Sequence, residues 1–292
     1  MTHPADRATG PGGAVCRWHP DRPTLLACSR CGTPACPDCL SPAPVGQLCR
    51  NCVGAAARQT PRVRQVGATT PYATYTLIAI NVVVYIVAAL QAHTSALTAL
   101  NSRILWNGGL FEPKVADGEY YRLITSGFLH LSVWHIAANM IALLLIGAQL
   151  EKFMGTARFT GVYFISMLGG AAAVLALGDV NTLTAGASGA IYGLLGALLV
   201  IVVRGGQPPT QIVVIIALNL FITLAVPGIS LWDHLGGLVF GTLTMAAIVY
   251  LPRLVPDGRS GRAALINRLT WVTLGGLVVV TALLGVAAAL GR

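Results

Sequence analysis

The chain has 292 residues, of which 55% are hydrophobic and only 10% are charged, and its formal net charge is +9. Soluble domains carry about a quarter charged residues, so this composition excludes an ordinary soluble domain and predicts a polytopic membrane protein. The 19 Lys and Arg residues are scattered in short runs between apolar segments, which favours a membrane orientation signal over a nucleic-acid-binding surface.

All seven cysteines lie within the first 53 residues, so the cysteine chemistry belongs to one small N-terminal module. An odd number of cysteines argues against a fully paired disulfide framework. The first 70 residues contain no stretch of signal-peptide type, so we expect the module to stay in the reducing cytoplasm. Residues 1–14 are rich in Pro, Gly and Ala and are predicted to form a disordered lead-in.

Residues 15–53 contain four pairs of metal-binding side chains, and two residues separate the members of each pair. Such a gap lets a tight turn direct both side chains at one tetrahedral ion, and eight ligands suffice for two zinc ions. Sites closed by four protein ligands are structural, and so short a segment needs them because it cannot bury enough apolar core. The predicted ligands are Cys16, His19, Cys28, Cys31, Cys36, Cys39, Cys49 and Cys52.

The order and spacing of these ligands resemble a B-box-type zinc finger. The resemblance implies that the pairs interleave, so that the first and third pairs hold one ion and the second and fourth hold the other. Pairing in sequence order is the alternative that the spacing leaves open. The position of the module, just before the first apolar segment, motivates the hypothesis that it recruits a cytoplasmic protein partner.

Seven apolar segments follow a linker at residues 54–73, and each is close to the roughly 20 residues that a helix needs to cross a bilayer. The first six form the expected core, residues 74–250, and a second linker at residues 251–267 leads to the seventh. The connection from Ala92 to Phe128 is semi-apolar, and we expect it to lie against the outer bilayer surface. The segments are predicted at residues 74–91, 129–150, 159–177, 187–203, 211–226, 231–250 and 268–290.

The basic residues predict the orientation of these segments. With a cytoplasmic N-terminus and an extracytoplasmic C-terminus, ten Lys or Arg residues fall on inner connections and four on outer ones, as expected for a multi-pass protein of the cell membrane. The inner set is Arg58, Arg62, Arg64, Lys152, Arg158, Arg204, Arg253, Arg259, Arg262 and Arg268, and the outer set is Arg103, Lys114, Arg122 and Arg292.

Ser188 begins the fourth segment and His234 opens the sixth at the same predicted depth. A serine in a membrane helix ordinarily only donates to a carbonyl one turn earlier, so its neighbours decide its role. Both segments carry a GxxxG pair, Gly189 with Gly193 and Gly237 with Gly241, which lets two helix backbones pack closely. An imidazole within hydrogen-bond reach activates a serine hydroxyl as a nucleophile, so we predict a serine and histidine dyad.

Two further residues border this dyad. Tyr192 lies four residues after Ser188 on the same helix face and is predicted to orient the imidazole, although an interfacial tyrosine is an equally good interpretation. Asp233 is adjacent to His234 and therefore points to a different face. We expect it at the outer surface, outside the dyad.

The second segment begins with polar side chains. His135 and Asn139 are four residues apart and share one helix face, so both donors are expected to point into the bundle. Together with the backbone N–H of Ser188 they suit a developing oxyanion, whereas a helix-to-helix hydrogen-bond pair is the simpler alternative. His130 lies on a different face, and anchoring a loop or holding a water molecule are both compatible with its position.

The sequence resembles the rhomboid intramembrane serine proteases in the combination of three motifs. These are HxxxxHxxxN on the second segment, GxSG at the start of the fourth, and His234 followed by GGxxxG on the sixth. The resemblance implies a six-helix bundle plus a C-terminal seventh helix, with Ser188 as nucleophile and His234 as base. Leu150-Glu151-Lys152 also fits the family pattern. One departure is Tyr121-Arg122, where the family has Trp-Arg, so loop anchoring by Arg122 is expected but not an indole-specific role.

The function implied by this resemblance is hydrolysis of peptide bonds in or near transmembrane segments of single-span substrates. The fifth segment and residues 227–230 would then form the gate and cap. A non-catalytic rhomboid-like protein that binds membrane helices is the main rival, although it would be expected to lack the nucleophile or the base. A transporter is a second rival, but it predicts broken helices or paired acidic residues at mid-membrane.

Overall fold

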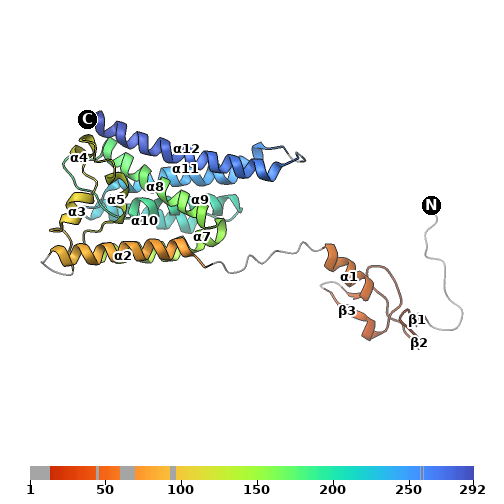
Figure 1. Cartoon of the computed structure of the whole chain (residues 1–292). Coiled ribbons are helices and arrows are strands. Elements are labelled where there is room, and N and C mark those ends of the chain that lie inside the picture. Colours follow the sequence, from red (N-terminus) through yellow and green to blue (C-terminus); the bar gives the residue numbers. More distant parts are fainter. Residues whose placement is uncertain (1–13, 44–45, 60–69, 93–96, 257, 259) are drawn as a thin grey trace. The chain divides into compact units, whose positions relative to one another are not determined.

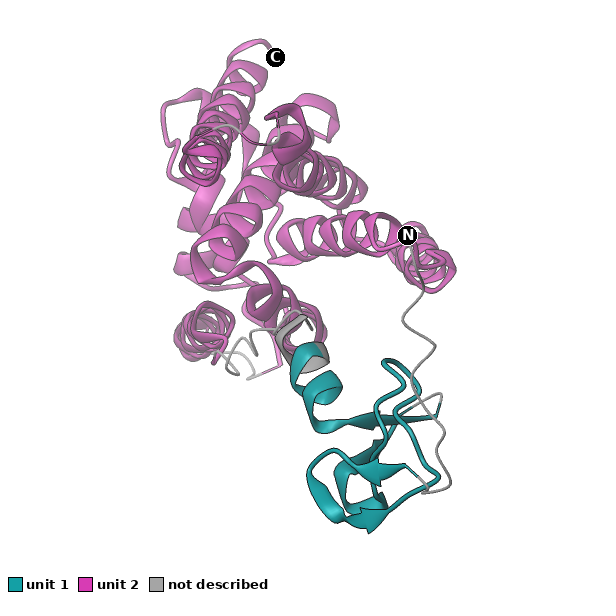
Figure 2. Ribbon diagram, turned by 90° about the vertical axis from the view of Figure 1, so that its right-hand side faces the viewer, with its two compact units in different colours: residues 1–67 teal, residues 68–292 magenta. Residues whose placement is uncertain are grey.

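The computed structural model of the chain describes residues 14–43, 46–59, 70–92, 97–256, 258 and 260–292. The chain divides into two compact units, residues 1–67 and 68–292 (Figure 2). The expected lead-in at residues 1–14 lies almost wholly outside the described residues, and so do Arg62, Arg64 and Arg259 of the orientation argument.

The first unit consists of two small antiparallel sheets and one helix. Strand β1 (Val15–Cys16) pairs with β2 (His19–Pro23), and β3 (Leu40–Pro42), which follows the short helix η1 (Pro37–Cys39), pairs with β4 (Gln47–Cys49). Among its described residues the buried cluster consists of five cysteines with Ala35 and Leu40, and the partly buried Trp18 and Leu48 pack against it. An aliphatic core of this size cannot stabilise a fold, so the unit depends on what its cysteines bind.

Helix α1 (Arg50–Gln59) closes the first unit and continues past residue 53, where the linker is predicted to begin. Residues 55–57 are three consecutive alanines, and alanine has the highest helix propensity, which favours continuing the helix into this segment.

The second unit is a bundle of apolar helices. All seven predicted segments are helical, and among the described residues five are long and apolar enough to cross a membrane, whereas α9 and α10 are shorter, with 17 and 16 residues. The helices are α2 (Tyr72–Ala92), α6 (Val133–Ala142) continued by a π-helical turn η3 (Leu143–Gly147) into α7 (Ala148–Met154), α8 (Thr156–Leu177), α9 (Ser188–Arg204), α10 (Thr210–Ala225), α11 (Leu231–Tyr250) and α12 (Arg262–Leu290).

Three boundaries differ from the predicted ones by four residues or more, and one of them is the end of the second segment, at Met154 instead of residue 150. The second segment begins at Val133 instead of residue 129, because Ser132 caps the helix by accepting a hydrogen bond from the backbone N–H of His135 over 3.3 Å. Helix α12 begins at Arg262, inside the predicted linker 251–267, and the short helix η4 (Leu251–Leu254) occupies the start of that linker.

The connection between α2 and α6 is folded. It contains α3 (Arg103–Gly108), α4 (Glu112–Ala116), α5 (Arg122–Thr125) and the short helix η2 (Ser126–Phe128), and these elements gather at one end of the bundle (Figure 1). Arg122, only 4% exposed, holds the connection together. Its Nη1 donates to the carbonyls of Trp106 and Gly109 over 2.9 and 2.7 Å, and its Nε donates to Glu119 over 2.7 Å.

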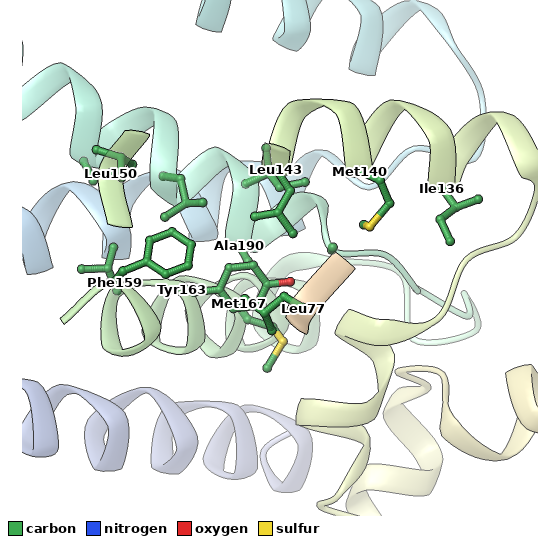
Figure 3. Close-up of a cluster of buried hydrophobic side chains, with 14 of the residues drawn as sticks. Leu77, Ile136, Met140, Leu143, Leu150, Phe159, Tyr163, Met167 and Ala190 are labelled. Carbon is green, nitrogen blue, oxygen red and sulfur yellow. The ribbon is translucent and has the colours of Figure 1, made fainter. Parts of the chain in front are cut away.

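The apolar core of the bundle joins helices from both halves of the chain. Leu77 of α2, Met140 of α6 and Leu143 of η3 meet Phe159 and Tyr163 of α8 in one buried cluster (Figure 3). This cluster keeps the start of α6 against α8 and α9, so the polar residues of α6 stay beside the start of α9.

Glycines bring α9 and α11 into backbone contact, as the two GxxxG pairs predict. A Cβ on Gly237 would overlap the carbonyl oxygen of Gly189, and a Cβ on Gly241 would overlap the backbone of Gly193. Gly236 makes the same close approach to Gly169 of α8. Helix α11 is therefore enclosed between α8 and α9, and its first turn lies beside the first turn of α9.

Glu151 fastens the beginning of α2 to the turn between α7 and α8. This carboxylate is 2% exposed and accepts hydrogen bonds from the backbone N–H groups of Ala73 and Thr74 over 2.9 and 2.8 Å. The hydroxyls of Thr74 and Thr156 also donate to it, each over 2.8 Å. An anion at a helix N-terminus satisfies N–H groups that have no partner within the helix, so Glu151 acts as the cap of α2.

Candidate active site and metal centres

Main-chain hydrogen bonds hold the segment that leads into Ser188. The N–H and carbonyl of Leu110 pair with the carbonyl and N–H of Thr184 over 2.8 and 2.9 Å, and the N–H of Gly186 donates to the carbonyl of Ser126 over 3.0 Å. Gly186 has a φ of +146°, which an L side chain rarely adopts. Ser188 therefore lies at the first position of α9, at the end of the bundle that also contains the folded connection.

Ser188 donates a hydrogen bond from its hydroxyl to Oδ2 of Asp233 over 3.0 Å. Asp233 is 9% exposed, so the expectation that it lies at the outer surface is wrong. The reason is that α11 is covered on opposite faces. A Cβ on Gly170 of α8 or on Gly189 of α9 would touch the Asp233 side chain. The face of α11 that carries Asp233 is therefore inside the bundle, although it is not the face that carries His234.

His234 is buried and held by residues of two other helices. Its ring stacks on Tyr192 of α9 with ring centroids 4.0 Å apart and an interplanar angle of 15°, in the arrangement expected for Tyr192. Its Nδ1 lies 2.8 Å from Oγ1 of Thr223 on α10. The sequence interpretation did not include Thr223, because a threonine in an apolar helix carries no local sign that its partner is on another helix.

His135 lies beside the serine, and Asn139 lies one turn further along α6. A Cβ on Gly186 would be 2.9 Å from Nε2 of His135 and 3.5 Å from Oγ of Ser188, so both groups flank the same glycine. Asn139 is 7% exposed and donates from Nδ2 to the carbonyl of His135 over 2.9 Å. One N–H of the amide is therefore used within its own helix, which leaves the second for another acceptor.

His130 is brought next to His135. The two rings meet edge to face with centroids 5.0 Å apart, and His130 is 1% exposed. Within the part of the chain that the structure describes, neither ring nitrogen of His130 has a hydrogen-bond partner.

The N-terminal unit brings the eight predicted metal ligands into two groups of four, and the groups follow the interleaved order. In each group the candidate ligand atoms all lie within 4.8 Å of one another. The pairing in sequence order, which the spacing left open, does not occur in this geometry. The groups are Cys16, His19, Cys36 and Cys39, and Cys28, Cys31, Cys49 and Cys52.

The distances in both groups fit a tetrahedral ion. Sulfur atoms bound at about 2.3 Å in a tetrahedron are about 3.8 Å apart, and the Cys31 and Cys49 sulfurs are separated by 3.7 Å. Nδ1 of His19 lies 3.3 Å from the sulfur of Cys36 and 3.4 Å from that of Cys39. All ligand atoms are nitrogen or sulfur, so the donor sets suit zinc.

The thiols of one group differ widely in acidity. The backbone N–H of Cys49 donates to the Cys28 sulfur over 3.2 Å and lowers the pKa of that thiol to about 6. A hydrogen bond with the Cys31 sulfur, followed by burial, raises the pKa of the Cys52 thiol to about 12. A bound divalent cation would favour the thiolate form of every ligand and so remove this conflict.

Comparisons with known proteins identify the family of this fold. The Rhomboid domain family matches residues 117–251, which contain every residue of the candidate active site. Rhomboid protease GluP of Bacillus subtilis is 32% identical over 186 residues, which cover 61% of this chain and 35% of that protein. RHOMBOID-like protein 4 of Arabidopsis thaliana is 34% identical over 152 residues, covering 50% of this chain and 38% of that protein.

A shorter relative is covered almost throughout. The putative rhomboid protease YdcA of Bacillus subtilis is 30% identical over 174 residues, which cover 57% of this chain and 83% of that protein. The chain is therefore a multi-pass helical membrane protein, and it belongs to the rhomboid family. It spans less than half the length of several of the other relatives it matches.

Proposed function

We propose that this protein is an intramembrane serine endopeptidase that cleaves transmembrane protein substrates. One observation carries the proposal. Close packing of α9 against α11 sets Ser188 and the Tyr192-stacked ring of His234 in adjacent first turns, although 45 residues separate Ser188 from Asp233, the residue it touches. A nucleophile, a base and a ring that orients the base are the parts that acyl transfer by serine requires.

In the proposed reaction Ser188 Oγ attacks the scissile carbonyl carbon while His234 takes the hydroxyl proton. His234 then gives that proton to the leaving amine, and the C–N bond breaks to leave an ester on Ser188. A water molecule attacks the ester, loses its proton to His234, and releases the new carboxylate as Ser188 recovers its proton.

His135, Asn139 and the backbone N–H of Ser188 are the proposed donors to the oxyanion formed in both steps. The position of the His135 ring beside Ser188 supports its part in this set. Asn139 contributes through the N–H that it does not use within α6. Loss of one such donor typically lowers the rate about a hundredfold to a thousandfold.

We infer the orientation and the substrates from the same arrangement. With the N-terminus in the cytoplasm, Ser188 and His234 lie near the outer face of the cell membrane, so the enzyme would cut single-span segments close to that face. Helix α10 and residues 227–230 would form the entrance, because α10 has only two buried residues, Ile216 and Thr223, and is weakly held by the bundle.

The N-terminal unit is proposed to hold two structural zinc ions, one in each four-residue group. Its proposed role is to recruit a cytoplasmic partner or the cytoplasmic tail of a substrate. Deleting residues 1–60 is then expected to reduce cleavage of a native substrate more than cleavage of a generic transmembrane peptide. Equal losses with both substrates would exclude a recruiting role.

A fluorophosphonate probe tests the catalytic proposal. The purified full chain is expected to be labelled, and Ser188→Ala and His234→Ala are expected to abolish labelling. Ser166→Ala is the matched control, because Ser166 is a fully buried serine whose hydroxyl, among the described residues, donates to the carbonyl of Val162 over 2.7 Å. Labelling that survives in Ser188→Ala, or an unlabelled parent protein, would contradict the proposal.

A further inference from the structure

The hydroxyl of Thr223 has three polar neighbours, one from each of three helices. Its Oγ1 lies 2.9 Å from the carbonyl oxygen of Asn219 on α10, 2.8 Å from Nδ1 of His234 on α11, and 3.3 Å from the hydroxyl of Tyr192 on α9. Thr223 is 5% exposed, so water cannot easily replace any of these partners.

The chemistry of these groups decides which of them donates. A carbonyl only accepts, so the single proton of the Thr223 hydroxyl is directed at Asn219, and two lone pairs remain on Oγ1. Tyr192 can fill one lone pair by donating its hydroxyl proton. The other lone pair faces Nδ1 of His234, and a contact of 2.8 Å between them is favourable only when Nδ1 carries a proton.

We propose that Thr223 is a positioning residue that fixes His234 in the tautomer with its proton on Nδ1. In neutral imidazole only one nitrogen carries a proton, so Nε2 then keeps the lone pair that accepts the proton of Ser188. Thr223 thus supplies, with an uncharged hydroxyl on a third helix, the tautomer control that a carboxylate supplies in a serine, histidine and aspartate triad. This inference rests on the proposed roles of Ser188 and His234.

The position of Thr223 makes the state of the base depend on α10. Among the residues of α10, all of which the structure describes, only Ile216 and Thr223 are buried, and large apolar side chains such as Phe221 and Leu224 are exposed. A helix held by so few contacts can be displaced at low energy, and its displacement would remove the acceptor from Nδ1. The tautomer of His234 therefore depends on whether α10 is packed against the bundle.

Two measurements on the full chain in lipid bilayers test the inference. Solid-state 15N NMR of protein labelled at histidine nitrogens, with His234 assigned by its loss in His234→Gln, is expected to show a protonated Nδ1 and an unprotonated Nε2. In Thr223→Val, which keeps the shape but lacks the hydroxyl, the proton is expected to move to Nε2 in part of the molecules.

The rate of fluorophosphonate labelling is the second measurement. Thr223→Val is expected to lower it about tenfold, the factor that corresponds to the loss of one ordinary hydrogen bond, and Thr223→Ser is expected to restore it. Thr281→Val is the matched control, since Thr281 is fully buried on α12 and, within the described residues, its hydroxyl donates to carbonyls of its own helix.

Each outcome supports or overturns the inference. A parent protein with Nε2 protonated overturns it even if Thr223→Val does not fold, and so does a folded Thr223→Val that labels as fast as the parent. If the parent does not label but Nδ1 of His234 carries the proton, the positioning role stands and the proposed protease activity fails. If labelling falls equally in Thr223→Val and Thr281→Val, the role of Thr223 is only structural.

Discussion

The Ser188 hydroxyl donates a hydrogen bond to Asp233, which directly precedes the proposed base His234 in the chain. In the described part of the chain no hydrogen bond joins Ser188 to His234, so the carboxylate holds the nucleophile in this arrangement. The hydroxyl must therefore leave Asp233 before its proton can pass to His234.

Replacing Asp233 with asparagine is expected to raise the rate of fluorophosphonate labelling about fivefold. A hydrogen bond to a carboxylate is stronger than one to an amide oxygen by about 1 kcal/mol, so the hydroxyl is released more easily in the variant. The charge of Asp233 should matter less, because it acts in opposite directions on the imidazolium and the oxyanion that form together. Labelling rates of Asp233→Asn and of Asp117→Asn, at an exposed aspartate, give the comparison. A slower Asp233→Asn would mean that the carboxylate assists the base.

Gly237→Ala is expected to lower the free energy of unfolding by about 1–3 kcal/mol and to reduce labelling, because the added methyl group pushes α11 away from Gly189. Thermal unfolding in detergent measures the first effect. Gly276→Ala on α12 is the matched control, since a Cβ there meets no atom within 4 Å. Equal unfolding temperatures for the two variants would show that α9 and α11 do not need backbone contact.

Glu151→Gln is expected to destabilise the bundle by about 2 kcal/mol or more. Each carboxylate oxygen of Glu151 accepts two hydrogen bonds, whereas the amide nitrogen of glutamine can only donate and would face a backbone N–H that also only donates. Glu112→Gln, at a partly exposed glutamate, is the control in the same thermal unfolding experiment. A small effect at Glu151 would mean that the start of α2 is held by apolar packing alone.

Zinc content distinguishes the two pairings of the metal ligands. The full chain is expected to bind two zinc ions, and Cys16→Ser with Cys36→Ser is expected to leave one, because both residues belong to the same group. Cys16→Ser with Cys28→Ser is expected to leave none, since one ligand is lost from each group. Elemental analysis after dialysis gives the counts, and pairing in sequence order would exchange the two results.

The contribution of Glu119 to the stability of the folded protein is expected to depend on pH. Hydrogen bonds from Tyr121 and Arg122 lower the pKa of the Glu119 carboxyl in the folded protein. Its stabilising effect is therefore complete above the ordinary pKa of glutamate and is lost as the pH falls through the lowered value. The difference in unfolding temperature between the parent and Glu119→Gln should be present at pH 7 and disappear in acid. A difference that does not shrink as the pH is lowered would contradict this role.

Periodicity and spacing in the sequence predict much of this structure. The seven helical segments, the close approach of the glycine pairs and the identity of the eight metal ligands all follow from rules that act over one or two helical turns or one metal ion. The folded connection with α3, α4 and α5 does not follow from such rules. It is held by Arg122 contacts with main-chain carbonyls more than ten residues away, and these leave no trace in local composition.

The wrong prediction that Asp233 lies at the surface also comes from the local range of these rules. Helical periodicity shows that Asp233 and His234 cannot share a face, but it does not show how many faces of α11 are covered. Because glycines on both α8 and α9 let α11 approach closely, the face of α11 that carries Asp233 is also buried in the bundle. Thr223 was not predicted as a site residue for the same reason, since its role depends on the side chain that it contacts on another helix.

The main-chain hydrogen bonds of Leu110, Thr184, Ser126 and Gly186 have a consequence for how this site tolerates mutation. They place the proposed nucleophile without using any side chain of the residues that form them. In a scan of all substitutions, Leu110, Ser126 and Thr184 should accept a variety of side chains that pack acceptably, whereas proline at Leu110 or Thr184 should be as damaging as loss of the serine. Gly186 should accept no side chain, because its φ is +146° and a Cβ would lie against the His135 ring. Sequences that have drifted apart in this region can therefore still present the serine at the same point.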